Sequence, residues 1–269
     1  ICGVTGDDVN EYNLSTAWDV STASYLQNFS VASQDSQPRG LFFKSDGTKM
    51  YIVGDASNQI FEYNLSTAWD VSTAAYNSVY NSGGQEAQPT GVFFKPDGTR
   101  MFLVGRNGDD VNEYNLSTAW GISSASYVRN FSVSGEDASP SGVFFKPDGL
   151  KMYIVGDGTN KIFEYSLSTA WDISTSVYSQ DFSVSGEDAN PLGMFFKPDG
   201  MKMYVVGLQN DKVYEYNVGS SASSTGYVPS ITNSSGQIDT TYWTDINSMT
   251  TDDIAGAGAA YYAVSTDDR

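Results

Sequence analysis

Short apolar runs alternate with turn-forming residues along most of the chain, and no stretch shows the 3.6-residue spacing of a helix. In residues 142–156, the runs Gly-Val-Phe-Phe-Lys and Lys-Met-Tyr-Ile-Val flank a Pro-Asp-Gly turn. Proline presets φ, and Asp-Gly tolerates the positive φ of a tight reversal, so the pattern predicts a β-hairpin. The same hairpin starts at Gly40, Gly91, Gly142 and Gly193, at intervals of 51 residues.

One repeat divides into four strand-like segments, which we call A to D in chain order. In the third repeat they are residues 142–146, 151–155, 161–167 and 178–184. The C–D linker contains Ser-Thr-Ala-Trp-Asp, which predicts a single capped helical turn. Four short antiparallel strands in a unit of about 40–55 residues are typical of a propeller blade. We therefore expect an all-β fold, a β-propeller of four-stranded antiparallel blades.

The repeat also predicts the domain organisation. Recognisable repeats run through about residue 217, residues 218–258 diverge from them as a connector, and all of 1–269 is expected to form one propeller domain. A ring of blades must remove its free edges. Residues 259–265 contain Tyr261-Tyr262, which align with the Phe-Phe pair of segment A. We expect this segment to be the inner strand of the first blade, so that N- and C-terminal strands close a ring of five blades.

Composition limits the partners. The net charge is −18, from 32 acidic and 14 basic residues, which disfavours nucleic acid and anionic membrane surfaces. No apolar run reaches the length of a membrane span. The chain has no histidine, which removes His-based triads and most zinc sites. Its one cysteine, Cys2, stands where the repeat has valine, so we interpret it as a strand residue.

Alternating strand direction places the D–A and B–C loops on one face, which we call the acidic face. We assign no catalytic residue, and the candidate binding residues on this face are Asp35, Glu86, Asp137, Asp188, Asp55, Asp109, Asp157 and Asp211. Carboxylates around a channel mouth could hold Ca²⁺, with the D–A loop residues as ligands. The alternative is that they are solvated and form Asx turns. No cofactor is required by the pattern.

The A–B turns and C–D linkers share the opposite face, which we call the turn face. It is expected to carry lysines near the turns and a tryptophan in each linker: Trp18, Trp69, Trp120 and Trp171. These rings could contact a sugar ligand or pack between neighbouring blades. We favour packing, because a packing role must recur in every blade.

The core Phe-Lys-Pro-Asp-Gly-x-Lys-Met-Tyr-Ile-Val-Gly resembles the repeat of lactonase-like and YVTN-type β-propellers. The full unit, with Glu-Tyr-Asn-Leu-Ser-Thr-Ala-Trp-Asp, is similar to tandem repeats of tail and surface proteins from marine phages and aquatic bacteria. The lactonase resemblance implies a single calcium ion in the channel and an acid–base carboxylate.

Near-identical blades suit multivalent contact and present no unique set of carboxylates. We therefore expect a non-catalytic binding or structural module of a virion or extracellular surface protein. Its partner would be a cell-surface glycan, a protein receptor or further segments of the same longer protein. A self-assembling scaffold is the alternative, and a calcium-dependent lactonase is the third possibility.

Overall fold

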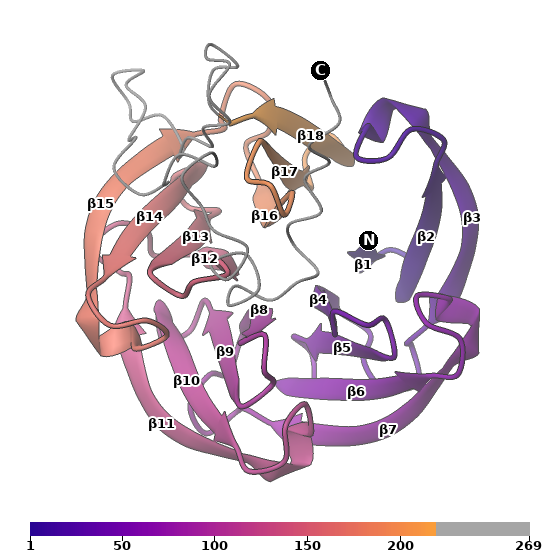
Figure 1. Cartoon of the computed structure of the whole chain (residues 1–269), viewed down its shortest axis with the longest axis horizontal. Helices are drawn as coiled ribbons and strands as arrows, with labels where there is room; N and C mark the ends of the chain where they lie inside the picture. The colour runs from indigo at the N-terminus through magenta and orange to yellow at the C-terminus, as the bar shows by residue number, and fades with distance from the viewer. Residues whose placement is uncertain (219–269) are drawn as a thin grey trace, which may run out of the picture.

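The chain forms a five-bladed β-propeller, as the repeat predicts. The computed structural model describes residues 1–218, in which five antiparallel sheets surround a central hub (Figure 1). In blades 2 to 4, the first strand lies innermost and the last forms the rim. The expected connector beyond Val218 and the expected closing strand at residues 259–265 lie outside the described residues.

Within residues 1–218, three blades have four strands and two have three. Blade 1 has β1 (Cys2–Gly3), β2 (Asp8–Leu14) and β3 (Ala23–Ser30). Blade 2 has β4 (Pro38–Phe43), β5 (Lys49–Gly54), β6 (Gln59–Leu65) and β7 (Ala74–Asn81). Blade 3 has β8 (Pro89–Phe94), β9 (Arg100–Gly105), β10 (Asp110–Leu116) and β11 (Ala125–Ser132). Blade 4 has β12 (Pro140–Phe145), β13 (Lys151–Gly156), β14 (Lys161–Leu167) and β15 (Ser176–Ser183), and blade 5 has β16 (Pro191–Phe196), β17 (Lys202–Gly207) and β18 (Lys212–Asn217).

The inner hairpin forms where the turn chemistry places it. In blade 4, β12 pairs with β13 so that Phe144 lies opposite Tyr153. The amide of Gly149 donates to the Lys146 carbonyl at 2.8 Å, and Gly149 has a φ of 73°, which glycine adopts without a Cβ penalty. The segment boundaries read from the sequence therefore agree with the strands to within about two residues.

The C–D linker differs in detail from the expected helical turn. A short 3₁₀ helix follows each tryptophan: η1 (Val20–Thr22), η2 (Val71–Thr73), η3 (Ile122–Ser124) and η4 (Ile173–Thr175). In blade 4 the cap is Asp172, whose carboxylate accepts from the Ser174 amide at 3.1 Å, rather than the Ser or Thr before the tryptophan. Trp171 itself has a φ of 64°, a left-handed conformation that is rare for a bulky side chain.

The hydrophobic core lies largely between blades. Phe102 and Val104 of blade 3 pack in one buried cluster with Phe145 and Ile154 of blade 4. Blades 5 and 1 also meet, because the Tyr204 hydroxyl donates to the Trp18 carbonyl at 2.6 Å across 186 positions of sequence. No helix within residues 1–218 has the length and apolar character needed to cross a membrane.

Candidate functional site

The acidic residues of the D–A loops act as clamps between loops. All four residues at this repeat position are buried: Asp35, Glu86, Asp137 and Asp188. Asp137 accepts from the Ser139 amide at 2.7 Å within its own loop. It also accepts from the amide and hydroxyl of Thr159 in the next B–C loop, at 2.8 and 2.6 Å. Charge-assisted bonds of this kind are strong, so these carboxylates hold the loops of the acidic face together.

Two further candidates, Asp109 and Asp211, occupy a tight turn of the B–C loop. Their φ angles are 48° and 50°, and Asn58 and Asn160 adopt the same conformation in other blades. Asp and Asn tolerate this left-handed region better than most residues, which explains their choice. Burial raises the pKa of Asp109, and the neighbouring carboxylate of Asp137 raises it further.

At two positions of the repeat the charge of the side chain differs from blade to blade. The residue after the first proline of the inner strand is, in blades 2 to 5 in turn, Arg39, Thr90, Ser141 and Leu192. The first residue of the B–C loop is, in the same four blades, Asp55, Arg106, Asp157 and Leu208. Both positions lie on the acidic face, because the D–A loops lead into the innermost strands there and the B–C loops begin there.

These divergent residues form ion pairs that differ from blade to blade. Arg39 Nε lies 3.1 Å from Asp55 Oδ2 within blade 2. Arg106 Nη2 lies 2.7 Å from Asp157 Oδ2 across blades 3 and 4, and the Asn190 amide donates to Asp157 Oδ1 at 3.0 Å. We call these five residues the mouth cluster. The Arg106 Nε is buried and has no hydrogen-bond partner among residues 1–218.

Asp55 and Asp157 were predicted as candidates from the sequence, whereas Arg39 and Arg106 were not, because neither arginine recurs from blade to blade. The sequence signal that would have found them is a repeat position at which the sign of the charge changes from one repeat to the next. Within residues 1–218, the structure brings together no group of three carboxylate or cysteine side chains that could hold a metal ion.

On the turn face, each lysine beside the turn pairs with the aspartate of the same turn. The Nζ–Oδ2 distance for Lys146 and Asp148 is 2.6 Å, and the other pairs are Lys44–Asp46, Lys95–Asp97 and Lys197–Asp199. These pairs are partly exposed, so each contributes little stability. Their positive charges are therefore largely matched by neighbouring aspartates.

Three of the four tryptophans stack on an inner-strand phenylalanine of the preceding blade. Trp120 stacks on Phe42 of blade 2 and on Phe94 of its own blade, with ring centroids 6.4 and 5.7 Å apart. Trp171 makes the same two kinds of contact in blades 3 and 4. Trp18 stacks on Phe195 of blade 5, whereas Trp69 contacts Phe43 of its own blade.

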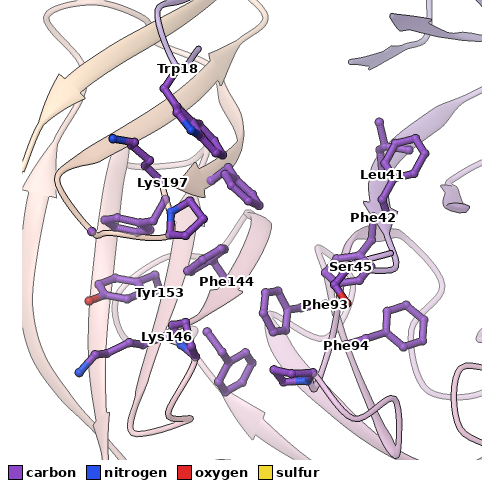
Figure 2. Close-up of a pocket in the computed structure, with 18 of the residues that line it drawn as sticks. Trp18, Leu41, Phe42, Ser45, Phe93, Phe94, Phe144, Lys146, Tyr153 and Lys197 are labelled. Carbon is purple, nitrogen blue, oxygen red and sulfur yellow. The ribbon is translucent and has the colours of Figure 1, made fainter. Parts of the chain in front are cut away.

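A cavity of about 460 Å³ opens at the hub on the turn face. Figure 2 shows Phe93 and Phe144 at its base, with Phe42 on one side and Trp18 on the other. Its walls are almost entirely aromatic and aliphatic, and Lys146 and Lys197 lie at its margin. The two faces of the hub are therefore chemically different: one carries the charged mouth cluster and the other an apolar cavity.

No protein-family model and no curated protein matches the chain. Solved structures share its fold. A candidate 6-phosphogluconolactonase from Bacteroides uniformis is 12% identical, with a TM-score of 0.50 over 88% of this chain and 67% of that protein. A protein from Lactobacillus plantarum is 16% identical, with a TM-score of 0.52 over 89% and 65%. The periplasmic gluconolactonase of Pseudomonas aeruginosa is 14% identical, with a TM-score of 0.47 over 88% and 63%.

The chain thus spans about two thirds of the length of these proteins. At this identity the likeness of the first two shows the fold alone, a β-propeller. The expectation of a non-catalytic surface module, and with it the scaffold alternative, was wrong. A structure with this fold is named as a lactonase, which is a hydrolase. The blades are also not equivalent, because their charged residues differ at the mouth cluster.

Proposed function

We propose that this propeller is a lactonase-like hydrolase whose site is the mouth cluster on the acidic face. The observation that carries the proposal is the asymmetry of that cluster. An ion pair between blades 3 and 4, Arg106 with Asp157, occupies a position where the repeat would otherwise place equivalent residues. The fold shared with a candidate 6-phosphogluconolactonase supports the choice of reaction class.

Hydrolysis of a lactone requires a base for water and a donor for the developing oxyanion. In the proposed mechanism, the Asp157 carboxylate takes a proton from water as the water oxygen bonds to the carbonyl carbon. The positive guanidinium of Arg106 stabilises the negative carbonyl oxygen. The ring C–O bond then breaks, and the leaving oxygen takes up the proton, which gives a hydroxy acid.

The neighbouring groups support these roles. Asn190 and Arg106 hold one oxygen each of Asp157, which fixes the orientation of the carboxylate. The side chains of Arg106 and Asp157 are 24% and 14% exposed, so the pair is partly shielded but accessible to a small polar substrate. We propose a sugar lactone as the substrate class, since such a ring presents a carbonyl and several hydroxyls to a charged site.

The test is lactone hydrolysis by the purified chain, followed as acid release with a pH indicator and compared with the spontaneous rate. Glucono-1,5-lactone and its 6-phosphate are the first substrates. We expect hydrolysis above the spontaneous rate and a loss of roughly 10²- to 10⁴-fold in D157N, the range typical of a general base. D181N is the matched control. Asp181 lies on the outer strand and pairs with Lys161, so this variant should retain activity. Full activity of D157N, or no activity on any lactone, contradicts the proposal.

A further inference from the structure

The apolar cavity at the hub has the form of a slot between blades 5 and 2. Phe42, Phe93, Phe144 and Phe195 each occupy the same position of an inner strand and form an arc around the hub. Successive rings meet edge to face, with centroids 5.4, 5.3 and 5.6 Å apart. The arc ends at Phe195, whose side chain is 49% exposed. Figure 2 shows open space between Phe42 and the side of the cavity that carries Trp18.

The exposure of the tryptophans also changes at blade 1. Trp120 and Trp171, which have aromatic neighbours in two blades, are 9% and 8% exposed. Trp69 contacts Phe43 of its own blade and is 51% exposed, because blade 1 supplies no inner-strand aromatic within residues 1–218. Trp18 stacks on blade 5 but has no inner-strand partner in its own blade, and it is 37% exposed. One aromatic strand between these two indoles would cover both.

The glycines of the inner strands show at which junction between blades a neighbouring strand is missing among residues 1–218. A Cβ on Gly40 would lie 3.1 Å from Gly91 Cα, one on Gly91 would lie 3.0 Å from Gly142 Cα, and one on Gly142 would lie 3.2 Å from Gly193 Cα. A Cβ on Gly193 would meet no atom within 4 Å. Three consecutive junctions are therefore in close contact, and the next position is vacant.

The edge of β1 faces this vacancy. Cys2 pairs with Val9 on its outer side. The equivalent Val53 in blade 2 pairs both outward with Ile60 and inward with Gly40. The inner edge of β1 has no strand partner among residues 1–218, and an unpaired edge is a template for an added strand.

We infer that the slot receives residues 259–265 of this chain as the inner strand of blade 1. Tyr261 and Tyr262 then take the positions of Phe42 and Phe43. Tyr261 completes the aromatic arc and covers Trp69, and Tyr262 packs on Trp18. Ala259 falls opposite Cys2, at the position where the other inner strands have glycine.

The length of the chain permits this arrangement. Val218, the last described residue, lines the cavity, and 51 residues follow it. Residues 219–258 could span about 130 Å when fully extended, so the connector can reach the slot by many routes. The inference concerns the opposite face from the mouth cluster and does not depend on the proposed hydrolase activity.

A disulfide cross-link tests the pairing in the full chain. Cys2 is the chain's only cysteine, so a single substitution, A259C, creates one defined pair. A Cβ on Gly40 would lie 2.9 Å from a methyl carbon of Val53, so side chains at these two positions face each other. Residues opposite each other in antiparallel strands have a Cα separation of about 4.5–5.5 Å, which suits a disulfide. A260C is the matched control, since its side chain points to the other face of the strand.

We expect A259C to form an intramolecular disulfide on mild oxidation, identified by peptide mapping, with at least tenfold less in A260C. Equal cross-linking of the two variants, or a disulfide that joins two chains, overturns the inference. Hydrogen exchange of the wild-type chain gives a second readout that needs no substitution. Peptides covering residues 259–265 should exchange as slowly as those of β4, and exchange within seconds overturns the inference.

Discussion

Gly149 is the residue at which a single added methyl group tests the packing of the blades most directly. It has a φ of 73°, and the indole of Trp171 lies over it. A Cβ built on Gly149 would lie 2.5 Å from Trp171 Cδ1 and closer still to Nε1 and Cε2. The substitution G149A therefore creates both backbone strain and a steric clash.

The magnitude follows from two contributions. Placing a Cβ in the left-handed region costs about 1–2 kcal/mol. Displacing a packed side chain to relieve an overlap costs about 1–3 kcal/mol. The sum is roughly 2–5 kcal/mol, which for a domain of this size lowers the melting temperature by roughly 4–20 °C. Since Trp171 contacts two blades, the loss should appear in the global unfolding transition.

The assay is urea denaturation followed by tryptophan fluorescence and by far-ultraviolet circular dichroism. G186A is the matched control, because a Cβ on Gly186 would meet no atom within 4 Å and its φ is not in the left-handed range. We expect G186A to lie within about 1 kcal/mol of the wild type. Equal stability of G149A and G186A would refute the reasoning that the indole fixes the turn glycine.

Three further results are expected. D109N should stabilise the chain at pH 7, because burial raises the pKa of Asp109 and its ionised form disfavours folding above that pKa; denaturation at several pH values should show the gain shrinking as pH falls through the ordinary aspartate range. E164Q should lower the free energy of unfolding by about 3–5 kcal/mol, because it removes the charge 2.6 Å from buried Lys151. D181N, at a partly exposed ion pair, should lower it by less than about 1 kcal/mol. Equal losses in urea denaturation of the two variants would contradict this. Partial burial raises the pKa of Cys2 to about 11, so its alkylation at pH 8 should be about a hundredfold slower in the native than in the unfolded chain. Equal rates measured by mass spectrometry would contradict this prediction.

The fold was predictable because each repeat carries its own local signals. The Pro-Asp-Gly turn, the alternation of the flanking segments and the constant spacing specify hairpins without long-range information. The conformation of Trp171 was not predictable from the same signals. Its left-handed φ is accompanied by a hydrogen bond from the Trp171 amide to the Gly149 carbonyl and by stacking on Phe93 of the neighbouring blade. Both contacts exist only after the hairpin has formed.

The candidate site was predictable only in part. The acidic residues of the loops could be located, but not their separate roles. Asp137 holds a loop through donors 22 residues away, and Asp157 meets an arginine 51 residues away. Both partnerships depend on how consecutive blades are placed. A repeated sequence conceals such differences, because a residue that departs from the repeat looks like variation until its neighbour is known.

The single glycine in each inner strand also has a consequence for how many repeats the ring can hold. At the three junctions where it lies against the next blade, backbone meets backbone at nearly the same close distance. The circumference is thus set inside every repeat and not by the ends of the chain. A sixth copy inserted between existing repeats would have no sector to occupy unless these contacts opened. Enlarging the ring would require larger residues at Gly40, Gly91 and Gly142 together, not one substitution at a time.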